Sequence, residues 1–94
     1  MVTQAQIEKC VEVAKKYGAK KLVLFGSANE DPGHARDIDV ICMGLKEIDV
    51  LRMAAEIENE TSVLVDAVPG DPLTPFVKFN LPRGKVLYDA ARAA

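Results

Sequence analysis

Apolar residues along this chain recur in two periods, one typical of helices and one typical of strands. In residues 3–17 and 46–59 they repeat at three- and four-residue intervals, which predicts two amphipathic helices. Thr3 with Gln6 fits a capping box, and Gly18 fits the left-handed residue that ends a helix. The second helix is expected to carry one stripe that faces the core, at Ile48, Leu51, Ala55 and Glu58, with Ala54 and Ile57 beside it.

Short aliphatic runs outside these helices predict the strands of a sheet. They lie at residues 20–25, 37–43, 62–68 and 85–88. Thr74 and Pro75 begin a short helix that Pro82 ends, and its Phe76 and Phe79 are interpreted as core contacts rather than as a base-stacking platform. The order predicts an α/β (α+β) fold, in which a small mixed sheet is covered on one side by helices, with a frayed tail at residues 90–94.

Composition narrows the class of protein. The 94 residues are 49% hydrophobic, and a chain of this length supports one core, so a single domain at residues 1–94 is expected. The net charge of −2 gives no electrostatic reason to expect nucleic-acid binding. No apolar run approaches the ~20 residues that span a bilayer, and a cytoplasmic protein is expected. Cys10 and Cys42 are expected to be buried free thiols.

Two aspartates open the strand at residues 37–43. Side chains alternate between the two faces of a strand, so Asp37 and Asp39 share one face while Ile38, Val40 and Cys42 share the other. Such a pair is common on solvated strands, but in apolar surroundings the two like charges repel. This strand is otherwise apolar and therefore looks central. A divalent cation is the usual way to offset the repulsion.

A third aspartate and a glycine turn strengthen the metal hypothesis. Asp66 sits in a strand that is otherwise apolar on both faces, where a lone carboxylate needs a partner. Gly26 and Ser27 end the preceding strand at the same edge of the sheet, and a glycine turn exposes backbone N–H groups that suit a phosphate. If the strands of Asp39 and Asp66 are neighbours, three carboxylates converge beside this turn, as a two-metal phosphoryl-transfer site requires.

These residues together resemble the minimal nucleotidyltransferases of the DNA polymerase β-like superfamily. The matching features are Phe25-Gly26-Ser27, a spacer of nine residues, Asp37-Ile38-Asp39, Asp66, and the closing RGKVLY at residues 83–88. The resemblance covers nearly the whole chain. Gly-Ser or Asp-x-Asp alone would be weak, whereas the combination is specific.

The resemblance implies a set of roles. Gly26 and Ser27 would bind the β- and γ-phosphates of a nucleoside triphosphate, most simply ATP, and Asp37 and Asp39 would bind two Mg²⁺ ions. Asp66 would complete one metal site and help to deprotonate an acceptor hydroxyl. The family also implies a small helical partner of the HEPN type, in a toxin–antitoxin pair in which the nucleotidyltransferase, as antitoxin, transfers AMP to a tyrosine of the toxin. A homo-oligomer is an alternative source of the acceptor pocket.

The chain also departs from the family pattern. Many relatives carry a basic residue soon after Gly-Ser. Here residues 28–31 read Ala-Asn-Glu-Asp, and the negative charges of the two acidic side chains would repel a triphosphate. Arg36 or His34 could compensate from the far end of the loop, although His34 is more simply explained as a solvated loop residue. Two other functions therefore stay open. One is a silent binding module that neutralises its partner by docking, and the other is transfer to a small molecule such as an aminoglycoside.

Overall fold

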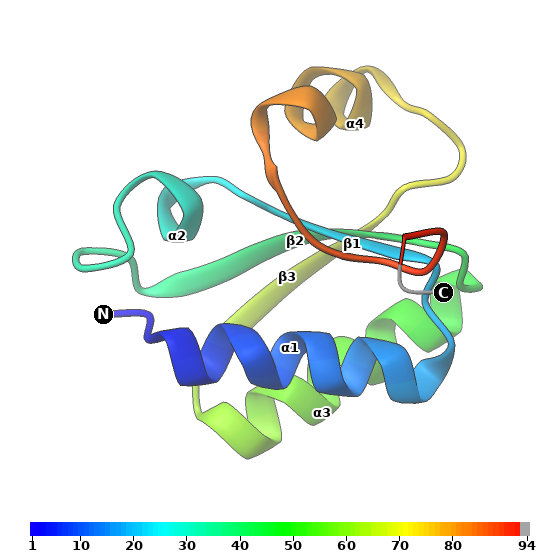
Figure 1. The fold of residues 1–94 in the computed structure, drawn as a ribbon. Coiled ribbons are helices and arrows are strands. Elements are labelled where there is room, and N and C mark those ends of the chain that lie inside the picture. Colours follow the sequence, from blue (N-terminus) through cyan, green and yellow to red (C-terminus); the bar gives the residue numbers. More distant parts are fainter. Residues whose placement is uncertain (93–94) are drawn as a thin grey trace.

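Two long helices lie along one face of a four-stranded sheet, and a short helix lies above the other face (Figure 1). The structure is a computed structural model and describes residues 1–92. In chain order the elements are α1 (Gln4–Tyr17), β1 (Lys21–Phe25), α2 (Ser27–Glu30), β2 (Asp37–Met43), α3 (Glu47–Thr61), β3 (Leu64–Pro69), α4 (Pro75–Asn80), the 3-10 turn η1 (Leu81–Arg83) and β4 (Lys85–Asp89). The single turn α2 falls in the segment that was expected to be a loop.

The sheet is mixed, as predicted. Its strand order is β3-β2-β1-β4, with β1 antiparallel to both β2 and β4, and β2 parallel to β3. A parallel pair needs a crossover, which α3 supplies between β2 and β3. The strand that begins with Asp37 is therefore an inner strand, and the strand that carries Asp66 is an edge strand.

The first core lies between the sheet and the long helices. The capping box of Thr3 with Gln6 and the left-handed Gly18, with φ 89°, confirm the predicted ends of α1. The expected stripe of α3 is wrong, because Ile48 and Leu51 are 51% and 60% exposed. The residues that α3 buries are Val50, Met53, Ala54 and Ile57. Both sets have helical spacing, and the buried set presents the more continuous apolar surface to the sheet and α1.

The second, smaller core lies under α4 on the opposite face. Val77 is fully buried against Val23, Phe25 and Ile41. The core assignment of Phe76 and Phe79 is wrong, since these side chains are 50% and 58% exposed. A helix as short as α4 directs one turn at the sheet, and Val77 occupies that position. The predicted N-cap is confirmed, because the Thr74 side chain accepts a hydrogen bond from the backbone N–H of Val77.

Both cysteines are free and buried, as expected. Burial raises the pKa of each thiol, Cys10 and Cys42, to about 11. At neutral pH such thiols are protonated, so they act as small apolar core residues.

The chain termini complete the description. The backbone N–H of Ala90 donates to the carbonyl of Lys20 at 2.8 Å, so the sheet's hydrogen bonding extends into the expected frayed tail. Residues 93–94 of that tail lie outside the described residues. Across residues 1–92, none of the helices combines the length and the apolar character that a bilayer span needs.

Candidate functional site

The candidate site lies on the sheet face opposite α1 and α3. Ile38 and Val40 point into the core beneath those helices, whereas Ile41 belongs to the core beneath α4. Asp37 and Asp39 have the same parity along the strand as Ile41, so they lie on the α4 side of the sheet. The predicted division of this strand into a carboxylate face and an apolar face is confirmed. The carboxylates lie at the beginning of β2, which is the end of the sheet where β1 finishes.

Asp66 lies beside Asp39 across the parallel strand pair. Asp39 and Asp66 are Cα partners in the register of β2 and β3, and Asp37 is the partner of Leu64. Partnered residues on neighbouring strands direct their side chains to the same face. The condition that these strands are neighbours is therefore met, and all three aspartates share one face.

Gly26 lies directly against the Asp39 carboxylate. Phe25 is the antiparallel partner of Asp39, so the turn that follows Phe25 passes over the beginning of β2. Gly26 has φ 72° and ψ −156°, a conformation essentially restricted to glycine. A Cβ atom at this position would come within 2.7 Å of Asp39 Oδ2. Only glycine lets the turn approach the carboxylate this closely.

Asp39 is the most buried of the three aspartates. Its pKa is raised above the ordinary value, first by burial and then by the negative charges of Asp66 and Asp37. Asp37 and Asp66 are exposed, while Asp39 is half-buried. The expectation that Asp66 is the buried carboxylate is therefore wrong. The reason is that β3 is an edge strand, which leaves this face of it open to solvent.

The raised pKa of Asp39 predicts a pH dependence of stability. Between its unfolded pKa, near 3.8, and its higher folded pKa, the folded protein retains a proton that the unfolded chain has released. The free energy of unfolding should therefore fall as pH rises through this interval. Urea denaturation from about pH 4 upward measures it. Asp39→Asn should remove this component, whereas Asp71→Asn, at an exposed position at the other end of β3, should retain it. Identical slopes in Asp39→Asn and wild type would contradict the prediction.

The donor set suits a hard divalent cation such as Mg²⁺. Three carboxylates on one face supply only oxygen ligands, which Mg²⁺ prefers. Among the ion pairs formed within residues 1–92, none involves Asp37, Asp39 or Asp66. In the same part of the chain, however, no three His, Cys, Asp or Glu side chains gather closely enough to hold one ion. The aspartates share a face without converging on a point, and the metal assignment stays a prediction.

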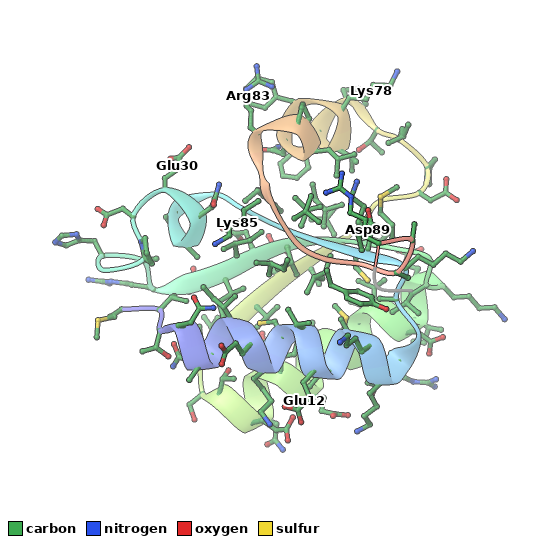
Figure 2. The ribbon with its side chains drawn as sticks, in the orientation of Figure 1. Glu12, Glu30, Lys78, Arg83, Lys85 and Asp89 are labelled. Carbon is green, nitrogen blue, oxygen red and sulfur yellow. The ribbon has the colours of Figure 1, made fainter. Side chains whose placement is uncertain are left out.

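The segment between Ser27 and Asp37 is held in place by contacts with the helix-covered core and with the N-terminus. Ala28 and Ala35 are buried in the core under the long helices, and the backbone N–H of Val2 donates to the carbonyl of Pro32 at 2.9 Å. His34 Nδ1 lies 3.0 Å from Asp31 Oδ2, so His34 is engaged within the loop. Both residues expected to compensate the acidic loop, His34 and Arg36, are exposed, and Arg36 directly precedes Asp37 in the chain. Glu30 points outward from α2 (Figure 2).

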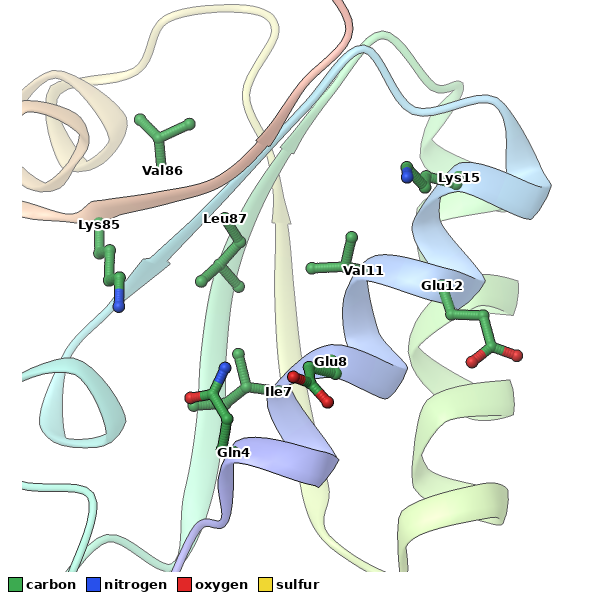
Figure 3. A pocket seen from close by; sticks show the side chains of 9 residues that line it. All are labelled: Gln4, Ile7, Glu8, Val11, Glu12, Lys15, Lys85, Val86 and Leu87. Carbon is green, nitrogen blue, oxygen red and sulfur yellow. The ribbon is translucent and has the colours of Figure 1, made fainter. Parts of the chain in front are cut away.

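Two surface hollows lie away from the aspartates. The first, of about 520 Å³, is between α1 and β4, where Leu87 faces Ile7 and Val11 on the helix-covered side of the sheet (Figure 3). The second, of about 760 Å³, is lined by residues such as Lys20 and Gly44, at the opposite end of the sheet from the aspartates. Neither hollow includes a predicted site residue. At the candidate site itself, Asp37 and Asp66 are exposed to solvent and Asp39 is half-buried.

Comparisons with known proteins place this geometry in a fold family. No protein-family model and no curated protein matches the sequence. Among solved structures, one described as a minimal nucleotidyltransferase is 25% identical, with 90% of each chain covered and a TM-score of 0.69. The chain has the minimal nucleotidyltransferase fold. The resemblance drawn from Gly26-Ser27 and the aspartates is thereby confirmed for the fold.

The same fold occurs in toxin–antitoxin complexes. A chain from a toxin–antitoxin complex with AMP-PNP is 19% identical, with a TM-score of 0.77, and the match covers 93% of this chain and 76% of that one. A chain from a complex of the tri-AMPylated Shewanella oneidensis HEPN toxin with its MNT antitoxin is 18% identical, with a TM-score of 0.72, and the match covers 96% of this chain and 75% of that one. At these identities the likeness concerns the minimal nucleotidyltransferase fold alone.

Proposed function

We propose that this chain is a Mg²⁺-dependent nucleotidyltransferase that transfers AMP from ATP to a hydroxyl group of a partner protein. The observation that carries the proposal is the arrangement of Gly26, Asp39 and Asp66. The turn at Gly26, which only glycine readily adopts, lies against the partly buried carboxylate of Asp39. Asp66 is the neighbour of Asp39 on the next strand. Within this fold, the combination matches the needs of phosphoryl transfer.

Each predicted residue has a place in this proposal. Asp37 and Asp39 would hold the metal ions, with Asp66 completing one of the two sites. Gly26 and Ser27 would bind the β- and γ-phosphates, and Arg36, which directly precedes Asp37 in the chain, would contact a phosphate oxygen. When bound, the two ions supply positive charge to the non-bridging and leaving oxygens of the reacting phosphate.

The reaction is an in-line displacement at the α-phosphorus of ATP. The acceptor oxygen forms a bond to phosphorus while the bond from phosphorus to the oxygen bridging toward the β-phosphate breaks. Pyrophosphate leaves with the electrons of that bond. The Asp66 carboxylate accepts the proton of the acceptor hydroxyl, and its exposure on the edge strand leaves it accessible to a partner.

The acceptor we propose is a tyrosine of a small helical protein of the HEPN type. Two observations support this choice. The similar structures include toxin–antitoxin complexes, one of which contains a tri-AMPylated HEPN toxin. In addition, the aspartate face of this chain is open, so a large acceptor could reach it. The proposal places the chain in the role of antitoxin in the cytoplasm.

A second candidate function is a docking module with a silent site. Its support is the acidic Glu30 close behind Ser27, together with three aspartates that do not gather around one point. In this case the partner would be neutralised by binding alone.

Label transfer separates the two functions. We expect radioactivity to pass from α-labelled ATP, but not from γ-labelled ATP, to a helical protein encoded by the neighbouring gene, and to require Mg²⁺. Label from the α-phosphate on the acceptor identifies nucleotidyl transfer, because phosphorylation would transfer the γ-phosphate instead. Mutating the labelled tyrosine to phenylalanine is the matched control. If the partner remains unlabelled yet its toxicity is still neutralised, the docking module is correct and the enzymatic proposal is wrong.

A further inference from the structure

Helix α4 presents an aromatic surface on the same side of the sheet as the aspartates. Val77 anchors the helix, because it is fully buried against β1 and β2 residues. Phe76 precedes this anchor and is half exposed. The Asn80 side chain donates to the carbonyl of Phe76 at 3.0 Å, and Thr74 caps the first turn. The backbone that carries Phe76 is therefore held in place.

Phe76 reaches the aspartate face through Phe25. The two rings meet edge to face, with centroids 5.6 Å apart and planes at 77°. Phe25 is in turn the cross-strand partner of Asp39, and it immediately precedes Gly26. Directly opposed side chains in an antiparallel pair have Cβ atoms only about 4.5–5.5 Å apart. Phe76 therefore stands at the rim of the candidate site, one side chain away from the carboxylate and the turn.

The second exposed phenylalanine of α4 has a different environment. The guanidinium of Arg83 lies 3.9 Å from the centroid of the Phe79 ring, and Arg83 also donates to the carbonyl of Phe79. Arg83 and Lys78 lie on the outer side of α4, away from the sheet (Figure 2). One face of Phe79 is thus occupied by a cation. Within residues 1–92, Phe76 has no comparable cation–π partner.

We propose that Phe76 is the surface on which the base of the nucleoside triphosphate stacks. This rests on the proposed function, since the phosphates must lie at Gly26 and Ser27. A half-exposed ring fixed at the rim of an otherwise open site offers a π-face to the base, and base stacking on aromatic rings is largely independent of base identity. The proposal implies weak discrimination between ATP and GTP, because stacking reads no hydrogen-bonding edge.

The test compares a ligand that has a base with one that lacks it. Binding of ATP and of inorganic tripolyphosphate, each with Mg²⁺, is measured by calorimetry for wild type, Phe76→Ala and Phe79→Ala. We expect Phe76→Ala to weaken ATP binding about tenfold to a hundredfold and to leave tripolyphosphate binding unchanged. Phe79→Ala, equally exposed on the same helix, should change neither. Thermal melting of each variant checks that the fold is intact.

A second variant gives an independent readout. The chain contains no tryptophan, so Phe76→Trp introduces the only indole. Its fluorescence should be quenched by ATP and by GTP but not by tripolyphosphate, and Phe79→Trp should show no such quenching. Unchanged ATP binding in Phe76→Ala, with partner binding weakened instead, would overturn the proposal and assign this surface to protein docking. If wild type binds neither ATP nor tripolyphosphate, the proposed function itself fails.

Discussion

Asp39→Asn is expected to abolish nucleotidyl transfer and to raise the melting temperature of the metal-free protein. Activity is lost because a neutral amide replaces the most buried of the three carboxylates that we propose bind the metal ions. Electrostatic stabilisation by a bound metal contributes several kcal/mol to a transition state, so the expected loss is at least about a thousandfold. Stability increases because the substitution removes a negative charge that is half-buried beside Asp66 and Asp37.

Magnesium should reverse the order of the melting temperatures. An ion that binds only the folded state stabilises it increasingly as its concentration rises above the dissociation constant, so wild type should gain stability with added Mg²⁺ and Asp39→Asn should not. Differential scanning fluorimetry with and without EDTA measures both effects. Asp66→Asn is the informative comparison, because the exposed Asp66 should give a loss of transfer without a comparable rise in melting temperature. A metal-free Asp39→Asn protein that melts below wild type would contradict the electrostatic account.

The local features of this fold were predictable because they depend on short stretches of chain. The capping box of Thr3 with Gln6 and the left-handed Gly18 define α1 by hydrogen bonds that span three or four residues. The shared face of Asp37 and Asp39 follows from the two-residue repeat of a strand. The neighbouring placement of Asp39 and Asp66 was expected only as a condition. Confirming it required the strand order, which depends on contacts between residues that are far apart in the sequence.

The errors arose where more than one local solution has the right spacing. Ile48 and Leu51 have helical spacing, as do Val50 and Met53, but the buried set is the more continuously apolar and packs against the sheet. The exposure of Phe76 has the same origin, since a six-residue helix presents either flank with similar ease. The exposure of Asp66 depends on β3 being an edge strand. Each of these outcomes is set by tertiary packing, which overrides local periodicity.

The close approach of Gly26 to Asp39 is a site feature that the sequence only partly signalled. A glycine before serine indicated a turn, but the pattern carries no information about which side chain the turn approaches. That contact predicts a specific defect in Gly26→Ala. The new Cβ would meet Asp39 Oδ2 at 2.7 Å, on a backbone with φ 72° and ψ −156° that alanine adopts only with strain.

We expect Gly26→Ala to lower the free energy of unfolding by about 3 kcal/mol or more, combining backbone strain with a steric clash. It should also abolish transfer, because relief of the clash displaces the Asp39 carboxylate or the turn that we propose binds the phosphates. Gly18→Ala is the matched control. Gly18 also has a positive φ, of 89°, but a Cβ there would meet nothing within 4 Å. This variant should lose about 1–2 kcal/mol from strain alone and retain full activity.

A double-mutant cycle with Asp39→Ala isolates the contact from the strain. In the Asp39→Ala background the carboxylate is absent, so Gly26→Ala should lose only the strain component of its effect. Urea denaturation of the four proteins gives the coupling free energy between the two positions, which should be about 1–2 kcal/mol. Additive effects would mean that the carboxylate moves aside from the new Cβ at little cost, so that the contact does not constrain the turn. The Gly26 turn and the beginning of β2 would then be independent elements, and the proposed coupling of phosphate binding to metal binding would be wrong.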